Sequence, residues 1–138
     1  MVVISFCVFK EKILNGEKTQ TIRPYSQHRW NQLQSTGKLH LWWKVRSKER
    51  EFLKEVTLKQ IFPLRLYAPK DVWNFYSEGT EIGQMFKWLR GVWEMVDEKE
   101  EWEIVQRDGF ESINQFYQWF KEMYGKSINN MIFMVIRW

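Results

Sequence analysis

The sequence is poor in cysteine, proline and glycine. Its 138 residues include one Cys, three Pro and seven Gly. The single cysteine, Cys7, excludes a disulfide bond within the chain and a zinc site built from several cysteines. So low a cysteine content is also in keeping with a reducing compartment, and we expect a cytoplasmic protein.

Long hydrophobic runs are absent as well. No apolar stretch approaches the ~20 residues that a membrane-spanning helix needs, which predicts a protein without a membrane partner. The first residues, MVVISFCVF, lack the basic region and the small-residue cleavage site of a signal peptide. His28 and His40 stand alone rather than in a cluster of metal ligands, and we expect neither a metal nor a cofactor.

Aromatic residues, in contrast, are abundant. They make up 17% of the chain and include nine Trp, a composition far too apolar for a disordered segment. The length is that of one domain with a core of its own. Because the chain has no internal repeat, low-complexity tract or linker, we interpret residues 1–138 as a single domain.

The charge of the chain is unevenly distributed. The net charge is +4, but residues 1–67 carry 13 Lys or Arg against 5 Asp or Glu, a net +8. Residues 68–138 carry 8 against 12, a net −4. A basic half with interleaved aromatic side chains suits a polyanion, since neutralising phosphates supplies affinity that does not depend on base sequence. Charges that only keep a surface soluble are the alternative interpretation.

The first half predicts mostly strands, from its alternating and β-branched residues. The elements that we expect there are a strand over 2–9, a short helix that ends at Gly16, an extended segment over 19–23, a long polar loop over 25–37, a strand over 39–45, a basic turn over 46–51, and one long or two short strands over 52–67 with a break at Pro63.

The second half changes to helical periodicity. Apolar side chains follow helical spacing over 85–96, and the acidic run DEKEEWE predicts a second helix that ends near Asp108. Ser112, with Gln115 three residues later, is typical of a capping box and predicts a third helix that closes at Gly125. The last residues, MIFMVIRW, predict a strand. This order predicts an α+β domain whose sheet curls toward a barrel, with helices packed beside it.

One polar stretch, NGEKTQTIRP, is unusual for a plain structural turn. It places Lys18, Thr19, Thr21 and Arg23 behind a glycine and ahead of a proline. Arg offers a planar fork to a phosphate or a base edge, Lys offers a point charge, and a Thr hydroxyl both donates and accepts. We interpret the stretch as a ligand-recognition turn. We expect alanine at Lys18 or Arg23 to weaken ligand binding with little loss of stability.

The core of this turn, GEKTQTIR over residues 16–23, resembles the ASCH domain when it is taken with DGFESINQFYQWFKEMYG over 108–125 and the final FMVIRW. ASCH domains belong to the PUA-like superfamily of small β-barrels associated with RNA. The resemblance implies a PUA-like curled β-barrel of about five to six strands with flanking helices. Residues 69–97 have no counterpart in the family and are expected to be a helical insertion. The resemblance also implies that RNA or a nucleotide binds in a basic cleft.

The same resemblance leaves an enzyme open. One branch of the family is an amidohydrolase of acetylated cytidine that uses a Lys, a Thr and a Glu, which correspond here to Lys18, Thr21 and Gln115; another member is described as a ribonuclease. Gln115 cannot carry a proton, and in a capped helix it can bond to backbone instead. In an enzyme, Glu111 or Asp108 would have to supply the carboxyl group. The missing Glu favours binding without catalysis.

The candidate residues therefore fall into two sets. The predicted nucleic-acid-binding residues are Lys18, Thr19, Thr21, Arg23, Arg29, Lys44, Arg46, Lys48, Arg50 and Gln115. The catalytic candidates, for the enzymatic alternative only, are Lys18, Thr21 and Glu111. Trp42 and Trp43 point to opposite faces of a strand, so one is expected in the core. The other is either a platform for base stacking or covered by the insertion. A third possibility is a protein-interaction adaptor, or self-association, through the aromatic insertion.

Overall fold

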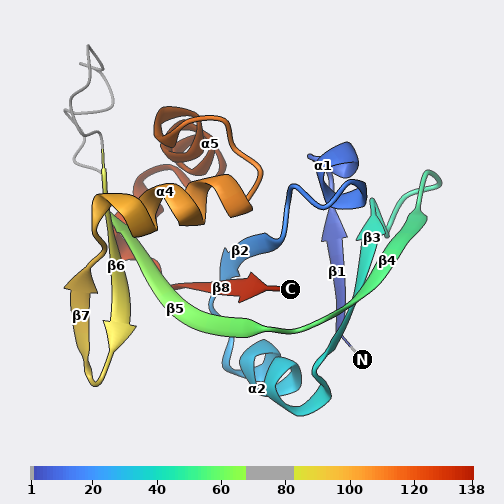
Figure 1. Cartoon of the computed structure of the whole chain (residues 1–138), viewed down its shortest axis with the longest axis horizontal. Coiled ribbons are helices and arrows are strands. Elements are labelled where there is room, and N and C mark those ends of the chain that lie inside the picture. Colours follow the sequence, from blue (N-terminus) through green and yellow to red (C-terminus); the bar gives the residue numbers. More distant parts are fainter. Residues whose placement is uncertain (1, 68–82) are drawn as a thin grey trace.

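The chain forms two β-sheets with helices packed around them (Figure 1), in a computed structural model that describes residues 2–67 and 83–138. One sheet has three strands in the order β1-β3-β4, and the other has five in the order β2-β8-β5-β6-β7. The predicted α+β class is confirmed. The described strands do not close into a ring, so the curled barrel that we expected is not confirmed.

The three-stranded sheet is built around β3. Its members are β1 (Val2–Phe6), β3 (Lys38–Trp43) and β4 (Glu51–Thr57). β1 runs parallel to β3, and β4 runs antiparallel to it with an irregularity between Leu41 and Trp42. Between β3 and β4 the chain turns through residues 44–50, close to the basic turn predicted over 46–51.

The five-stranded sheet is antiparallel throughout. Its members, in spatial order, are β2 (Gln20–Pro24), β8 (Phe133–Arg137), β5 (Gln60–Tyr67), β6 (Gln84–Leu89) and β7 (Val92–Met95). β2 contains the recognition turn's Thr21 and Arg23 and lies at one edge of this sheet, so its outer side is open to neighbouring elements.

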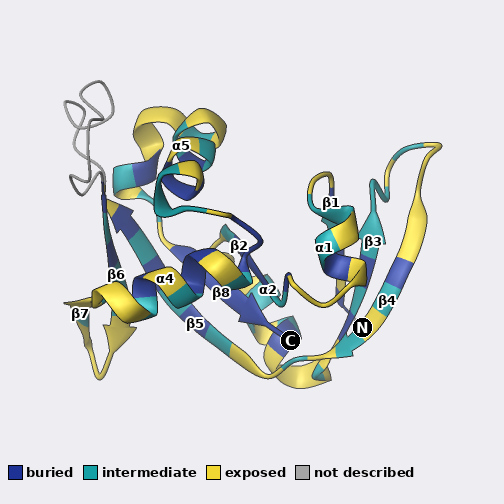
Figure 2. Ribbon diagram, turned by 45° about the horizontal axis from the view of Figure 1, so that its top comes forward, coloured by how far each residue is buried: buried dark blue, intermediate teal, exposed yellow. Residues whose placement is uncertain are grey.

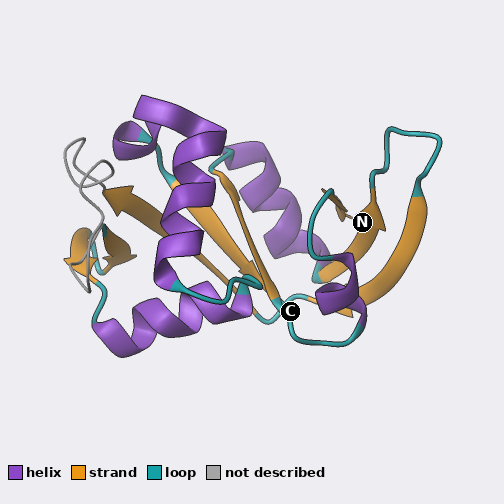
Figure 3. Ribbon diagram, turned by 90° about the horizontal axis from the view of Figure 1, so that it is seen from above, coloured by secondary structure: helices purple, strands orange, loops and turns teal. Residues whose placement is uncertain are grey.

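Four α-helices lie among the described residues. They are α1 (Lys10–Leu14), α2 (Gln27–Thr36), α4 (Glu98–Arg107) and α5 (Ile113–Tyr124), and a 3₁₀ segment over Gly125–Asn130 follows α5. α4 and α5 cover one side of the five-stranded sheet and α2 lies on the other (Figures 1 and 3). The helix that ends near Asp108 and the Ser112-capped helix that closes at Gly125 are both confirmed.

The predicted loop over 25–37 is wrong, because most of it is α2. The Ser26 hydroxyl accepts a hydrogen bond from the Arg29 backbone N–H at 3.3 Å and caps the helix. Gly37 ends the helix with a φ of 65°, a conformation that glycine adopts readily. One fully buried residue, Leu33, together with the partly buried Trp30, anchors this otherwise polar helix to the protein.

The predicted helix over 85–96 is also wrong. These residues form the β6–β7 hairpin, whose turn residues Arg90 and Gly91 both have positive φ, 51° and 86°. Positive φ at both central residues matches the twist of a two-residue hairpin turn. The rest of the expected insertion, residues 69–82, lies outside the described residues.

The break in the segment over 52–67 lies at Leu58 and Lys59, not at Pro63 as predicted. Pro63 is inside β5 and pairs with Met134 of β8. Pairing of β5 with β6 begins only at Leu64, so Pro63 sits where β5 has no second neighbour. A proline is tolerated at such a position because its missing N–H breaks no ladder.

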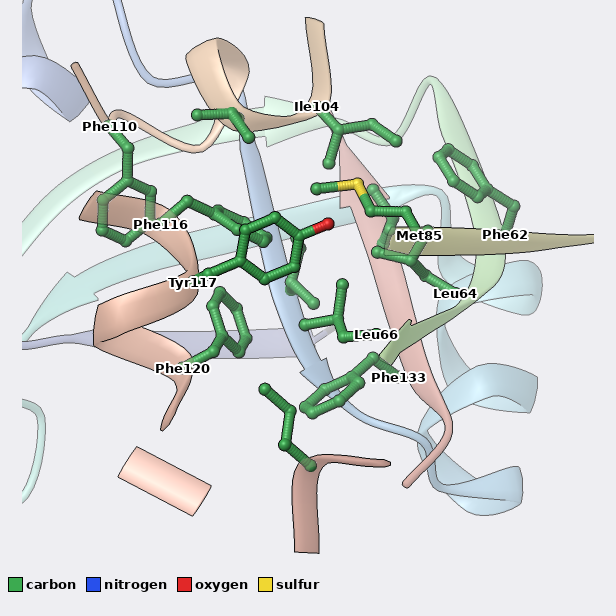
Figure 4. Packing of buried hydrophobic residues seen from close by; sticks show 14 residues of the cluster. Phe62, Leu64, Leu66, Met85, Ile104, Phe110, Phe116, Tyr117, Phe120 and Phe133 are labelled. Carbon is green, nitrogen blue, oxygen red and sulfur yellow. The ribbon is translucent and has the colours of Figure 1, made fainter. Parts of the chain in front are cut away.

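Two hydrophobic clusters share strand β8. Phe133 and Val135 belong to a cluster under α4 and α5, in which Figure 4 shows Phe133. Met134 and Ile136 belong to a second cluster with β1, β3 and α2. Because successive side chains of a strand point to opposite faces, β8 contributes side chains to both clusters. Figure 2 shows β8 buried along its length, whereas β7, the end of β6 and much of β4 are exposed.

Candidate nucleic-acid interface

The recognition turn is held in place by backbone hydrogen bonds on both sides. Gly16 reverses the chain with a φ of 86°, after which the Lys18 N–H donates to the Lys12 carbonyl at 2.9 Å. The Thr19 N–H then donates to the Arg107 carbonyl at 2.9 Å, and the Thr19 carbonyl accepts from Trp138 at 3.0 Å. These contacts tie the turn to the end of α4 and to the last residue of the chain.

Lys18 is buried against Asp108, which follows α4. The Lys18 side chain is 4% exposed, and its Nζ donates to the Asp108 carbonyl at 2.5 Å. The same Nζ lies 3.6 Å from Asp108 Oδ1. Burial lowers the pKa of Lys18 from 10.5 to about 8, against the opposing charge of Asp108. Burial raises the pKa of Asp108, against the opposing charge of Lys18.

A buried amide supports the Asp108 carboxyl group from the other side. Gln20 Nε2 donates to the Ile104 carbonyl at 2.8 Å and lies 3.4 Å from Asp108 Oδ1. Gln20 Oε1 in turn accepts from Arg137 Nε at 2.9 Å. The side chains of β2 and the end of β8 therefore fix the carboxyl group that faces Lys18.

Arg23 bridges β2 to β1. Its Nε donates to Thr21 Oγ1 at 3.0 Å, and its Nη2 donates to the Ser5 carbonyl at 2.7 Å. Its guanidinium also lies 5.0 Å from the centre of the Phe6 ring. Thr21 and Arg23 share a face of the strand, as their spacing predicts, and the hydrogen bond between them fixes their relative orientation.

Lys18, Thr21, Arg23 and Asp108 line a cavity of about 210 Å³ that we call the aromatic pocket. The rest of its wall is mostly apolar and comes from β1, the segment before α1, and α5. Its ring-bearing lining residues are Phe6, Phe9, Phe110, Trp119, Phe120 and Tyr124. Typical ligand pockets measure roughly 300–1,000 Å³, so this one suits a single small ring rather than a whole cofactor.

A larger hollow of about 1050 Å³ adjoins the pocket, and we call it the basic groove. Its cationic lining residues are Arg23, Arg29, Lys44 and Arg46. The lining comes from β1, the end of β2, α2 and the turn after β3, together with Met134 and Ile136 of β8. Arg23 and Ser5 belong to both cavities, so the two adjoin at these residues.

Some predicted site residues lie outside both cavities. Lys48 and Arg50 are exposed in the turn before β4, and Thr19 is occupied by the backbone contacts given above. Gln115 is exposed on α5, where its Oε1 accepts from the Glu111 N–H at 2.9 Å. Glu111 forms an ion pair with Lys12 at 2.6 Å.

The carboxyl group beside Lys18 thus comes from Asp108, not from Glu111 or from the position of Gln115. The burial of Lys18 also removes the basis for expecting a stable Lys18→Ala protein, since that expectation treats the residue as a surface charge. The aromatic wall from α5 was missed because its residues follow helical spacing, which predicts a core face and does not reveal a cavity beside it.

Neither of the two adjacent tryptophans is fully buried. Trp43 packs partly against the second hydrophobic cluster, with the amines of Lys44 and Lys10 at 5.4 and 5.8 Å from its ring. Trp42 lies on the opposite face and contacts Phe52 edge to face at 5.5 Å between ring centres. Trp42 pairs with Ser5, a lining residue of both cavities.

Comparisons of the chain with protein-family models, with curated proteins and with solved structures found no match. Within residues 2–67 and 83–138, no helix has the length and apolarity that crossing a membrane requires. In the same residues, no three His, Cys, Asp or Glu side chains gather closely enough to hold a metal ion.

Proposed function

We propose that the protein binds single-stranded RNA, with phosphates in the basic groove and one base in the aromatic pocket. The observation that carries this proposal is the position of Arg23, which lines both cavities and so joins a cationic surface to a ring-sized hollow. The resemblance of residues 16–23 to the ASCH domain supports the same function.

The groove provides the sequence-independent part of the affinity. Arg23, Arg29, Lys44 and Arg46 converge on it from β2, α2 and the turn after β3. Lys44 also contacts Glu49 at 3.1 Å, an exposed pair that a phosphate can displace because such pairs contribute little free energy. Each phosphate neutralised by one of these cations releases counterions from the RNA.

The pocket provides recognition of a base. Its aromatic side chains can stack on any base, a contact worth ~1–3 kcal/mol per base. The Lys18 amine donates to the Asp108 carbonyl and faces the Asp108 carboxyl group, so at least one of its three N–H donors is left for a base. The Thr21 hydroxyl accepts from Arg23 and can still donate. Trp42 offers a further stacking surface on the face that it shares with Ser5.

A hydrolase is the second candidate, because Lys18, Thr21 and a carboxyl group line the same pocket. A lysine whose pKa is lowered to about 8 can accept a proton from a hydroxyl nucleophile near neutral pH. In this alternative Thr21 is the nucleophile, Lys18 its base, and Asp108 takes the place of the family's Glu. Turnover of RNA or of acetylated cytidine, lost in Thr21→Val, would favour this alternative.

Salt-dependent binding of a labelled oligouridine tests the proposed function. With four groove cations in contact, the slope of log affinity against log salt should be near −2.8, about −0.7 per phosphate contact on a single strand. Arg46→Ala should reduce the steepness of the slope by roughly one contact. Lys48→Ala is the matched control, because Lys48 is an exposed cation of the same turn that does not line the groove.

The comparison of the two variants decides the outcome. An equal effect of Arg46→Ala and Lys48→Ala would show general charge attraction instead of binding in the groove. Phosphate contacts are stronger at low salt than at high salt. A failure to bind the RNA even at about 50 mM salt would therefore overturn the proposed function.

A further inference from the structure

The β6–β7 hairpin and its neighbour β5 present a second aromatic surface, outside both cavities. Residues directly opposite each other in antiparallel strands point to the same side of a sheet. The register therefore places Arg65, Phe86 and Met95 on one side, together with the cross-strand pair Trp88 and Trp93. We call these five residues the aromatic face.

The apolar side chains of the aromatic face are partly or largely exposed to solvent. Trp88 is 43% exposed and Met95 is 64% exposed, and Phe86 and Trp93 are partly exposed. The Trp88 and Trp93 rings meet edge to face with 5.3 Å between their centres. The Arg65 guanidinium lies 5.8 Å from the centre of the Trp93 ring and donates to the Asn129 carbonyl, so the cation is fixed beside the rings.

The charged residues of the hairpin strands, Lys87 and Glu94, lie on the side opposite to the aromatic face. Glu94 pairs with Lys87 across the strands, so both point to the side that α4 covers. Lys87 there contacts Glu100 of α4 at 3.2 Å. Among the five residues of the aromatic face, the charged one is Arg65, which is a cation. The face thus combines rings with positive charge, which suits a polyanion whose bases are unstacked.

The aromatic face lies on the same side of the sheet as the basic groove. Arg23 of the groove stands opposite Met134, and Met134 stands opposite Pro63, two residues before Arg65 on β5. Three strand spacings separate β2 from β6, a distance of about 14 Å at ~4.8 Å each. α2 lines the groove at the β2 end of this side, and the hairpin lies at the far end of the sheet (Figure 1).

We propose that the aromatic face is a stacking platform for bases of the same RNA strand whose phosphates occupy the basic groove. This inference rests on the proposed function and extends it to the length of RNA that the protein contacts. An oligonucleotide confined to the groove does not reach the platform, whereas a longer one does. Affinity should therefore depend on the aromatic face only for the longer RNA.

The test measures binding of labelled oligouridines of about 4 and about 12 nucleotides, within the range of known single-strand site sizes. Trp88→Leu keeps an apolar side chain but removes the ring, and Trp88→Phe keeps a ring. We expect Trp88→Leu to weaken binding of the longer RNA by roughly 5- to 150-fold, with Trp88→Phe near the wild type and the shorter RNA unaffected. Trp102→Leu is the control, because Trp102 is 40% exposed but lies on α4.

The other outcomes separate this inference from the function on which it rests. If the shorter RNA binds through Arg46 but Trp88→Leu leaves the longer RNA unchanged, the platform is refuted and the groove stands. If Trp88→Leu instead converts a dimer to a monomer without changing RNA affinity, the face is an interface between two copies. If neither RNA binds the wild type, both proposals fall together.

Discussion

Replacing Asp108 by Asn should add a pH dependence to the stability of the protein that comes from Lys18. The substitution keeps the backbone carbonyl to which Lys18 donates and removes the charge that helps to hold the Lys18 proton. The pKa of Lys18, about 8 in the wild type, should fall in the variant. Near neutral pH the folded variant then carries a neutral amine.

The size of the effect follows from proton linkage. In the wild type, the difference between a pKa of 10.5 unfolded and about 8 folded costs about 3 kcal/mol, at about 1.4 kcal/mol per unit. Below pH 8 the wild-type amine is protonated in both states, so it adds no further pH dependence. In Asp108→Asn the folded state binds fewer protons than the unfolded state, so stability falls by about 1.4 kcal/mol for each pH unit below 8.

Denaturant titrations at pH 8, 7 and 6 measure this difference. The two proteins should be close in free energy of unfolding at pH 8, about 1.4 kcal/mol apart at pH 7, and further apart at pH 6 until the variant's amine binds its proton. The double variant Lys18→Met, Asp108→Asn is the control, because without the amine the pH dependence should disappear. A difference between Asp108→Asn and wild type that stays constant with pH would refute the pairing of Lys18 with Asp108.

Three further predictions concern the same region. Between about pH 8 and 10.5 the wild type should gain stability relative to Lys18→Met in denaturant titrations, because the unfolded chain keeps a proton that folded Lys18 has released; a loss would contradict the burial of the amine. Gln115→Glu should not create hydrolysis of acetylated cytidine, since this side chain lies outside the pocket; new turnover would show that it reaches the substrate. Gly109→Ala should cost about 1–3 kcal/mol of stability and weaken RNA binding. Gly109 has a φ of 106°, and a Cβ there would lie 3.1 Å from the Phe9 ring in the pocket wall. An unchanged melting temperature would exclude this strain.

The parts of the fold that the sequence predicts well are those whose signals are local and agree with one another. For α5, Ser112 at the start, an apolar stripe at helical spacing and Gly125 at the end all point to one helix, and each is observed. The first and last strands and α4 are similar cases. In each of these elements, residues close in the chain decide the structure.

The two misread segments lack that agreement. In α2 the polar residues outnumber the buried ones, and Leu33 alone is fully buried, so no periodicity reveals the helix. In the β6–β7 hairpin, two strands joined at Arg90 and Gly91 happen to space their apolar residues as a helix would. Arg90 adopts a positive φ of 51°, which a non-glycine residue takes up uncommonly, so composition gives no turn signal at that position.

The candidate site divides in the same way. The sequence predicts that three neighbouring residues act together: Lys18, Thr21 and Arg23. In the structure all three line one pocket. The partner carboxyl is 90 residues away in the chain, and it meets Lys18 only because β2 packs beside the end of α4. Whether Asp108, Glu111 or residue 115 faces Lys18 depends on this tertiary contact, which no local pattern contains.

The most direct test of the proposed function is to locate the bound RNA on the protein. Backbone amide chemical shifts of the 17.1 kDa chain can be followed by NMR while a short oligouridine is added. The proposal predicts that the shifted amides concentrate in the basic groove and the aromatic pocket, around residues 3–9, 21–32, 44–47 and 108–124. Shifts confined to the outer surface of α4, or no shifts at all, would contradict it.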